Sequence, residues 1–305
     1  MNTIGVSGYE SEIARIIVSE IKKDTSIDGA GNIVCCTKGT EGEKKILIYA
    51  HMDEVGFQVI KKIDDNKYRI KPLGNIKTWN AIQQKVISDK TTGVLYAVNE
   101  DQLRAHNYDN IYLSVVDGKN PEIGDVFTFA TDFKEGGTYY SGKALDNRLS
   151  CAILIEIINM NIKTKADIYY VFTSQEEIGM RGARVAKTTI EPVLCIDLDV
   201  SAECDMNSLE MGKGAGIKLS DSMCVSSLEW VKRFEKIAID NKINFQREVS
   251  DCGTSELIIT NEYDNGCEEI GISIPCKYLH SANSLVAKND YDEVKNLLLK
   301  VIETL

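Results

Sequence analysis

Side chains of the kinds that bind metal ions or transfer protons stand beside several short apolar segments of this sequence. They are His51, Asp53, Asp146, Glu176, Glu177, Asp199 and His280. Imidazole nitrogens together with carboxylate oxygens suit zinc, cobalt or manganese better than a thiolate site would. Two imidazoles and three or more carboxylates supply enough ligands for two ions if one carboxylate bridges them. The residue types therefore predict a two-metal site, although its members are spread over about 230 residues and form no compact motif.

The apolar segments explain how residues so far apart in sequence can meet. Residues 45–50, 168–173, 193–198 and 270–275 have the length and composition of buried strands. In open α/β sheets, sites gather at the carboxyl ends of the strands. His51 and Asp53 follow the first segment, the two Glu follow the second, Asp199 ends the third, and His280 comes five residues after the fourth. We therefore expect them at one edge of a sheet.

Each of these residues, taken alone, also has a structural explanation. The pair at 176–177 is typical of an acidic first turn of a helix, and Asp146 of a helix N-cap. His51 fits an ordinary strand end and His280 an ordinary loop, while Asp199, like Asp197 before it, fits a turn. Only their joint placement at strand ends favours a site.

The remaining pattern predicts helices around this sheet and a β-rich insertion. A capping-box spacing at residues 7–10 predicts the start of the first helix, and Asn289 or Asp290 is expected to cap the last one. Residues 147–159 are apolar nearly all round, which indicates a buried helix. From about 56 to 140 the chain has β-like runs, a turn at 64–66 and hardly any helical periodicity. The sequence therefore predicts an all-β insertion inside an α/β domain.

Composition narrows the function classes. The 305 residues carry a net charge of −11, which disfavours binding to nucleic acid or to an anionic membrane surface. No apolar run reaches eighteen residues, and the N-terminus shows no secretory signal. The nine Cys form no C-x-x-C pair and indicate reduced thiols in a cytoplasmic protein. The glycine-rich segment 211–216 lacks the pattern of a phosphate-binding loop, and no G-x-S-x-G elbow occurs. His106 is interpreted as a structural or surface residue.

Three ordered motifs carry a resemblance to a known family. Residues 50–57 (AHMDEVGF), 142–148 (GKALDNR) and 172–183 (FTSQEEIGMRGA) resemble the tetrahedral aminopeptidases. Members are also called glutamyl or deblocking aminopeptidases, and many carry an old cellulase or endoglucanase label. The similarity extends nearly end to end, from residues 5–10 and 28–32 to residues 277–281.

The resemblance implies a zinc-peptidase-like mixed α/β sheet with helices on both faces, interrupted by a small all-β barrel domain. The catalytic domain would comprise residues 1–56 and 141–305, and the barrel residues 57–140. His51 and Asp199 would hold one metal, Glu177 and His280 the other, and Asp146 would bridge them. Glu176 would be the general base, and Asp53 would orient His51. The family spacing from residues 190–192 selects Asp199 over Asp197.

The implied activity is that of a di-metal aminopeptidase that trims short peptides. Zinc is the expected metal, with cobalt or manganese as alternatives. Two ions about 3.5–4 Å apart would activate a shared water as the nucleophile, with Glu176 accepting its proton. The family also implies a homo-oligomer, by analogy of twelve subunits.

Three other functions compete with this prediction. A deacylase acting on a small acylated amine needs the same di-metal site. A glycosidase needs no metal and many aromatic side chains to stack on the sugar. Only 7% of the 305 residues are aromatic, which disfavours this function. A non-catalytic binding protein is disfavoured because all the ligands and the base are present. Ser255, Lys277 and Ser284 depart from the family pattern, which bears on substrate preference.

Overall fold

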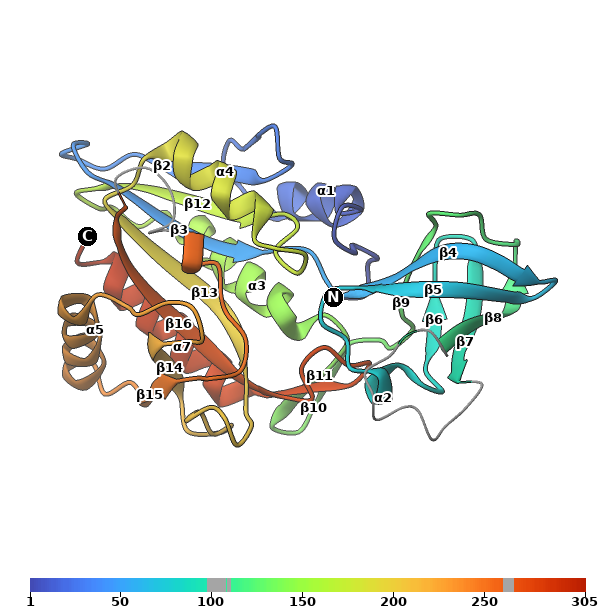
Figure 1. Cartoon of the computed structure of the whole chain (residues 1–305). Helices are drawn as coiled ribbons and strands as arrows, with labels where there is room; N and C mark the ends of the chain where they lie inside the picture. Colours follow the sequence, from blue (N-terminus) through green and yellow to red (C-terminus); the bar gives the residue numbers. More distant parts are fainter. Residues whose placement is uncertain (98–107, 109–110, 260–265) are drawn as a thin grey trace.

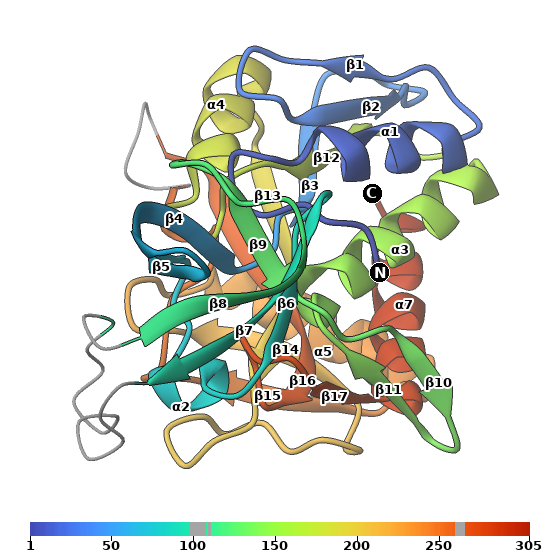
Figure 2. The same ribbon diagram turned by 90° about the vertical axis from the view of Figure 1, so that its right-hand side faces the viewer.

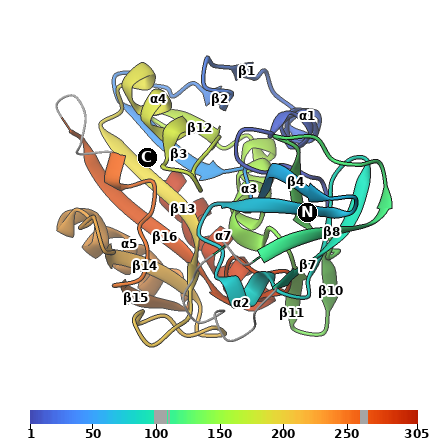
Figure 3. The same cartoon turned by 45° about the vertical axis from the view of Figure 1, so that its right-hand side comes forward.

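The computed structural model describes residues 1–97, 108, 111–259 and 266–305. It consists of a large α/β part built on an eleven-stranded sheet and a closed six-stranded β-barrel to one side of it (Figures 1 and 3). The predicted fold class is thereby confirmed. His106 lies outside the described residues. No helix in the described ranges has the length and apolar character that crossing a membrane requires.

The helices are α1 Ser11–Glu20, α2 Thr78–Ala81, α3 Leu145–Met160, α4 Arg181–Ile190, α5 Leu228–Asp240 and α7 Lys288–Ile302. The strands of the large sheet are β1 Ser26–Ile27, β2 Ile33–Thr37, β3 Lys45–His51, β10 Lys134–Gly136, β11 Tyr139–Gly142, β12 Asp167–Thr173, β13 Leu194–Ala202, β14 Ala215–Ser220, β15 Phe245–Val249, β16 Glu268–Lys277 and β17 Ser284–Ala287. The barrel strands are β4 Gly56–Asp64, β5 Lys67–Leu73, β6 Lys85–Ile87, β7 Thr91–Ala97, β8 Ile111–Gly118 and β9 Val126–Phe129.

The centre of the large sheet is parallel. Strands lie in the order β12, β3, β13, β16, and each neighbouring pair in this run is parallel. Thr173 at the end of β12 is in register with His51 at the end of β3. The carboxyl ends of these strands therefore meet at the same edge, as the sequence predicts. The four apolar segments all form strands because both faces of the sheet are covered.

Helices cover both faces of the sheet. On one face α1, α3, α5 and α7 share a large hydrophobic core, to which they contribute Ile13, Leu149, Val231 and Leu297 among others. On the other face α4 packs over a smaller cluster of apolar residues that includes Leu47 and Ile190 (Figure 2). The predicted helix at 147–159 is the core of α3 and is buried along most of its length.

The barrel has its own hydrophobic core, with Phe57, Phe127 and Phe129 fully buried. Its strands lie between residues 56 and 129, and the predicted turn at 64–66 joins β4 to β5. Strands β10 and β11 follow the barrel in sequence, yet β11 pairs with β17 in the large sheet. The division at residues 57 and 140 stays a prediction.

Two predicted helix caps are wrong. Helix α1 begins at Ser11 without a side-chain cap, because Ser7 donates its hydroxyl hydrogen bond to Asp53 instead. Helix α7 begins at Lys288, and Asp290 lies inside it. The Asp290 carboxylate accepts hydrogen bonds from the backbone N–H groups of Gly212 (2.5 Å) and Gly214 (2.8 Å). Two N–H groups of the glycine-rich segment are therefore occupied by a carboxylate of the same chain.

Candidate metal centre

The structure brings all of the predicted site residues together at one edge of the sheet. His51 is the last residue of β3, Asp199 lies in β13, and Asp146 is the second residue of α3. The loop after β12 carries Glu176 and Glu177, and the loop after β16 carries His280. The shared strand ends account for this convergence, because the loops after neighbouring parallel strands all begin at the same edge of the sheet.

Asp146 stands at the middle of the site. Its Oδ1 atom lies 3.0 Å from His51 Nε2, and its Oδ2 atom lies 3.1 Å from His280 Nε2. The two oxygens of one carboxylate thus face two imidazoles on opposite sides. The peptide bond between Asp146 and Asn147 is cis.

The remaining carboxylates divide between these two imidazoles. Asp199 Oδ1 is 3.6 Å from His51 Nε2, and Glu177 Oε1 is 3.3 Å from His280 Nε2. The possible ligand atoms lie within 4.8 Å of one another in two groups that share Asp146: one with His51 and Asp199, the other with Glu177 and His280. A third group of the same tightness combines His51 with both Glu176 and Glu177. Geometry alone therefore leaves Glu176 within reach of the same space.

Backbone carbonyls fix the orientation of both imidazoles. His51 Nδ1 lies 3.2 Å from the carbonyl oxygen of Asp53, and His280 Nδ1 lies 3.0 Å from that of Asn75. A carbonyl only accepts, so each Nδ1 carries a hydrogen and each Nε2 is the nitrogen that can coordinate an ion. Asn75 follows the barrel strand β5, so the barrel part of the chain helps to orient His280. No sequence pattern indicated this role for Asn75.

The site gathers several carboxylates in a buried space, and bound cations would balance their negative charge. Burial raises the pKa of Glu176 well above its ordinary value, and the neighbouring Glu177 and Asp199 raise it further. Burial would lower the pKa of His51, yet Glu176 and the other carboxylates raise it well above its ordinary value. Glu177 Oε1 is buried and receives no hydrogen bond. Divalent ions bind to donor groups of this kind: closely spaced carboxylates, a buried carboxylate oxygen without a hydrogen bond, and two oriented imidazoles.

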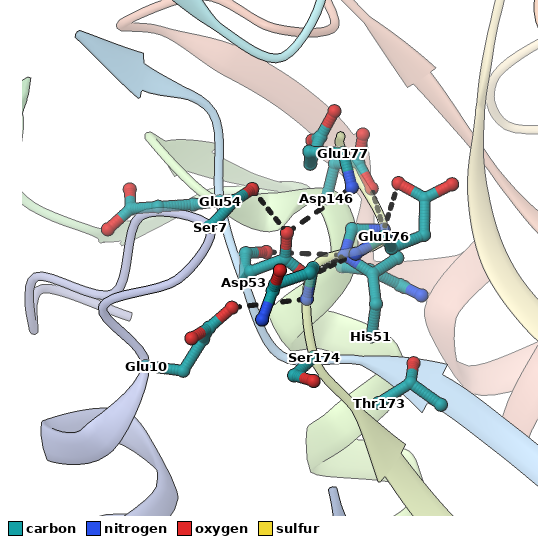
Figure 4. A network of polar contacts seen from close by, with 12 residues as sticks. Ser7, Glu10, His51, Asp53, Glu54, Asp146, Thr173, Ser174, Glu176 and Glu177 are labelled. Atoms are coloured by element: carbon teal, nitrogen blue, oxygen red, sulfur yellow. Dashed lines mark hydrogen bonds and ion pairs between the residues drawn. The ribbon is translucent and has the colours of Figure 1, made fainter. Parts of the chain in front are cut away.

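Asp53 positions the acidic loop as well as His51. Its Oδ1 accepts a hydrogen bond from the backbone N–H of Glu176 (3.0 Å), and its Oδ2 accepts one from that of Glu177 (3.2 Å). The Ser7 hydroxyl donates to the same Oδ2 at 2.5 Å (Figure 4). Asp53 Oδ1 lies 3.5 Å from His51 Nδ1. One fully buried carboxylate thus links the first imidazole to both glutamates.

Two further residues hold this loop, and the sequence assigned neither of them a role in the site. The Glu10 carboxylate accepts a hydrogen bond from the backbone N–H of Gln175, and Asn32 Oδ1 accepts one from that of Ser174. Asn32 also donates to the carbonyl of Gly182 at the start of α4. Both belong to segments that carry the resemblance, residues 5–10 and 28–32, so the motifs marked them without indicating what they do.

A cavity of about 260 Å³ opens beside these side chains. Its wall includes the proposed ligands together with Met180, Lys218, Cys252, Thr254 and Leu279. Of the described residues, the departures Ser255, Lys277 and Ser284 are not part of this wall. Ser255 donates to Asp221, Lys277 pairs with Glu203, and Ser284 donates to the carbonyl of Tyr278. Their effect on the cavity is therefore indirect.

Comparison with known proteins identifies the family of this chain. The family model of the M42 glutamyl aminopeptidases matches residues 31–297. A putative aminopeptidase of Acetivibrio thermocellus is 32% identical over 98% of this chain and 95% of its own length. The structure of the TET1 peptidase of Pyrococcus horikoshii, described as assembling into a tetrahedron or a large octahedral shell, superposes with a TM-score of 0.88 at 26% identity, covering 99% of this chain and 97% of that one.

A Thermotoga maritima structure titled endoglucanase also superposes, with a TM-score of 0.81 at 26% identity over 99% of this chain and 94% of that one. The expected mixture of aminopeptidase and endoglucanase labels is thus found among its relatives. The family model, the Acetivibrio thermocellus relative and the superposed structures each cover most of the chain. The chain belongs to the M42 family of glutamyl aminopeptidases and is a hydrolase of the peptidase class.

Proposed function

We propose that this M42 peptidase is a di-metal aminopeptidase that removes the N-terminal residue from short peptides. The observation that carries the proposal is the Asp146 carboxylate, whose two oxygens face the Nε2 atoms of His51 and His280 at 3.0 and 3.1 Å. A carboxylate between two oriented imidazoles is the arrangement that a pair of divalent ions requires if one ligand is to serve both.

The proposed ligands derive from this arrangement. His51 and Asp199 would hold one ion, Glu177 and His280 the other, and Asp146 would bridge the two ions. When bound, the ions lower the pKa of a water molecule and polarise the peptide carbonyl. Zinc is the proposed metal, with cobalt and manganese as alternatives, because nitrogen and oxygen donors suit all three.

Glu176 is the proposed general base. Its carboxylate is buried, its Oε2 lies 3.7 Å from His51 Nε2, and its backbone N–H is held by Asp53. A carboxylate that stays uncoordinated keeps enough basicity to take a proton from water and to return it to the leaving amine. The surrounding carboxylates also favour a positively charged substrate α-amine, which explains cleavage at the N-terminus only.

The proposal is tested by measuring metal content together with the hydrolysis of a panel of aminoacyl chromogenic substrates. The panel is run on the purified protein, after chelation, and after addition of zinc, cobalt or manganese. We expect about two ions per chain and activity that is lost and restored with them. The same substrates with acetylated N-termini serve as the control. Cleavage of the acetylated substrates only would replace the aminopeptidase by a deacylase, and a chain that binds no metal would refute the ligand assignment.

Assembly is a second part of the proposal. The TET1 peptidase of Pyrococcus horikoshii, a structural neighbour, assembles into closed shells, and another structural neighbour is titled a dodecamer. We propose that this chain likewise forms a homo-oligomer, of twelve subunits by that analogy, in the cytoplasm. A hollow assembly would admit short peptides and exclude folded proteins.

A further inference from the structure

Two cysteines approach each other beside the cavity of the proposed site. Cys204 and Cys252 are 48 positions apart in sequence, yet their sulfur atoms lie 3.0 Å apart. Cys204 is in the loop that follows β13, and Cys252 is in the loop that follows β15. Cys252 and its neighbours Gly253 and Thr254 form part of the cavity wall. Any reaction between these thiols would therefore act on that wall.

Backbone hydrogen bonds fix the two loops against each other. The N–H of Asp251 donates to the carbonyl of Met206 at 2.8 Å, and the N–H of Ser208 donates to that of Val249 at 3.1 Å. Asn207 and Ser250 form an antiparallel bridge between these contacts. The thiols meet at the end of a short paired segment, so their proximity does not depend on the side chains alone.

The two thiols differ in access. Cys204 is exposed, whereas Cys252 is half-buried and faces Ser250, whose hydroxyl oxygen lies 3.3 Å from its sulfur. Burial raises the pKa of Cys252. A second close pair, Cys195 and Cys267 at 3.3 Å, lies at the opposite end of the sheet, where Cys195 is fully buried. That pair is an internal control within the same chain.

We propose that Cys204 and Cys252 are a thiol-oxidation site for hydroperoxides, and that their disulfide lowers the peptidase activity by displacing the cavity wall. The effect on activity rests on the proposed aminopeptidase function, whereas the thiol chemistry does not.

The reaction balances with the peroxide as oxidant. The exposed Cys204 thiolate attacks the outer oxygen of the peroxide, which breaks the O–O bond, forms a sulfenic acid and releases an alcohol, or water in the case of hydrogen peroxide. Cys252 then attacks the sulfenic sulfur, the disulfide bond forms, and the hydroxyl leaves as water. Two thiols lose two electrons and the peroxide gains them. A small thiol reductant reverses the reaction by exchange.

Disulfide formation must draw the two sulfurs together, and Cys252 is the member of the pair that lies in the wall. The sulfurs are 3.0 Å apart and a disulfide requires about 2.05 Å. Further along, Thr254 and Ser255 are tied to Asp221 by hydrogen bonds from both side chains and from the Ser255 N–H. Gly253 has φ +90°, and its carbonyl accepts hydrogen bonds from the N–H and the hydroxyl of Ser222, so the displacement concentrates at Cys252. Since Cys252 lines the cavity, we expect kcat/KM to fall about tenfold in the oxidised enzyme.

The experiment treats the reduced, metal-loaded protein with increasing hydrogen peroxide, blocks the remaining thiols with an alkylating reagent, and maps the peptides by mass spectrometry. Aliquots are assayed for kcat and KM on an aminoacyl chromogenic substrate after the peroxide is removed. We expect a peptide cross-linked through 204 and 252 at peroxide doses that leave 195 and 267 reduced, together with the fall in kcat/KM, and recovery after a thiol reductant.

Three variants complete the test. Cys204→Ser should keep its activity after peroxide, Cys252→Ser should form no cross-link, and Cys267→Ser should respond like the wild type. Oxidation of Cys204 to sulfinic acid without a cross-link would overturn the disulfide site, and a cross-linked enzyme of unchanged kcat/KM would overturn its effect on the wall. A reduced enzyme without any aminopeptidase activity would instead refute the proposed function, and the peptide map would still decide the thiol chemistry.

Discussion

At the scale of single residues, the site depends on carboxylates that have different neighbours. Asp146 lies between two imidazoles. Asp53 accepts hydrogen bonds from the backbone N–H groups of the loop that carries Glu176. Asp53 is fully buried and receives three hydrogen bonds, so most of the acceptor capacity of its oxygens is used within the protein. Environment, more than residue type, therefore separates a bridging carboxylate from a supporting one.

Replacing Glu176 tests its separation from the metal ligands. We expect Glu176→Gln to lower kcat by about 10²- to 10⁴-fold while about two ions per chain are retained, because only the proton acceptor is removed. The matched variant Glu177→Gln should lower metal content as well as activity. The measurements are steady-state kinetics and elemental analysis of the same samples. Loss of metal from Glu176→Gln would show that Glu176 is itself a ligand.

Ser7 supports a milder prediction. Ser7→Ala removes the hydroxyl that donates to Asp53 Oδ2 at 2.5 Å, so the loop with Glu176 is held less firmly. A hydrogen bond to a charged group contributes about 1.5–3 kcal/mol, and we expect kcat to fall about tenfold with KM and metal content unchanged. Ser11→Ala, at an exposed position near the start of α1, is the control. A change in KM alone would contradict a positioning role.

Backbone strain is also concentrated at the site. Gln175, just before the general base, has φ +55°, and the proposed ligand His280 has φ +54°. Ala144, two residues before Asp146, has φ +54°. Residues other than glycine adopt this left-handed backbone conformation at a cost of about 1 kcal/mol or more, and such residues cluster at functional sites. The surrounding packing and hydrogen bonds maintain these conformations.

At the scale of elements, Glu54 connects the parts of the chain that surround the site. Its carboxylate accepts hydrogen bonds from Lys143 (2.7 Å), from Arg148 and the Gly5 N–H (both 3.1 Å), and from Thr128 of β9 (2.8 Å). The N-terminal segment, the barrel and the start of α3 therefore converge on one buried acid. Burial alone would raise the pKa of Glu54, but Arg148 and Lys143 outweigh burial and lower it.

Removing this charge should destabilise the fold. Glu54→Gln leaves two buried cations without their partner, and we expect the free energy of unfolding to fall by about 3–5 kcal/mol at pH 7. Because the folded-state pKa of Glu54 lies below its unfolded value, its contribution is present above the unfolded pKa and is lost as pH falls through the folded pKa. Urea unfolding at pH 7 and at lower pH measures both effects.

The exposed Glu43 provides the control for this variant, since Glu43→Gln removes the same charge without breaking a buried pair. Its unfolding free energy should match that of the wild type at every pH. If the difference between Glu54→Gln and the wild type stayed constant from pH 7 down to acid conditions, the ion pairs would not be its source.

At the scale of the whole molecule, the barrel and the sheet meet next to the site. His280 is oriented by the carbonyl of Asn75, which follows the barrel strand β5, and Glu54 accepts from Thr128 of the barrel. The chain's N-terminus lies at the same junction (Figure 1). A shift of the barrel relative to the sheet would therefore disturb a proposed ligand directly. The barrel side of the chain thus contributes to the orientation of a proposed ligand.

The proposed assembly is tested by measuring the mass of the particle in solution. We expect size-exclusion chromatography with light scattering to give about twelve times the 33.9 kDa chain mass, by analogy with the structural neighbour that is titled a dodecamer. Chelation followed by the same measurement shows whether the assembly depends on bound ions. A single species of 33.9 kDa at all concentrations would refute the oligomer.

The sequence by itself determined the four central strands, the buried helix and the residues that meet at the edge of the sheet. Each central strand is apolar on both faces and has a ligand-type residue at or near its carboxyl end, so the pattern of β3 with His51 and β12 with the two glutamates is readable locally. The resemblance then assigned roles that spacing left open, such as Asp199 over Asp197. Short-range periodicity and ordered motifs are properties of the sequence, so they can be recognised without knowing how the chain packs.

Tertiary structure alone decided which atoms meet. Ser7 has the spacing of a helix cap but donates to Asp53, 46 positions away, because the fold places a buried carboxylate within its reach. Asn75, Glu54 and the Cys204–Cys252 pair likewise acquire their partners from segments distant in sequence. Hydrogen bonds and pKa shifts depend on distance and burial in three dimensions, and a linear pattern contains neither.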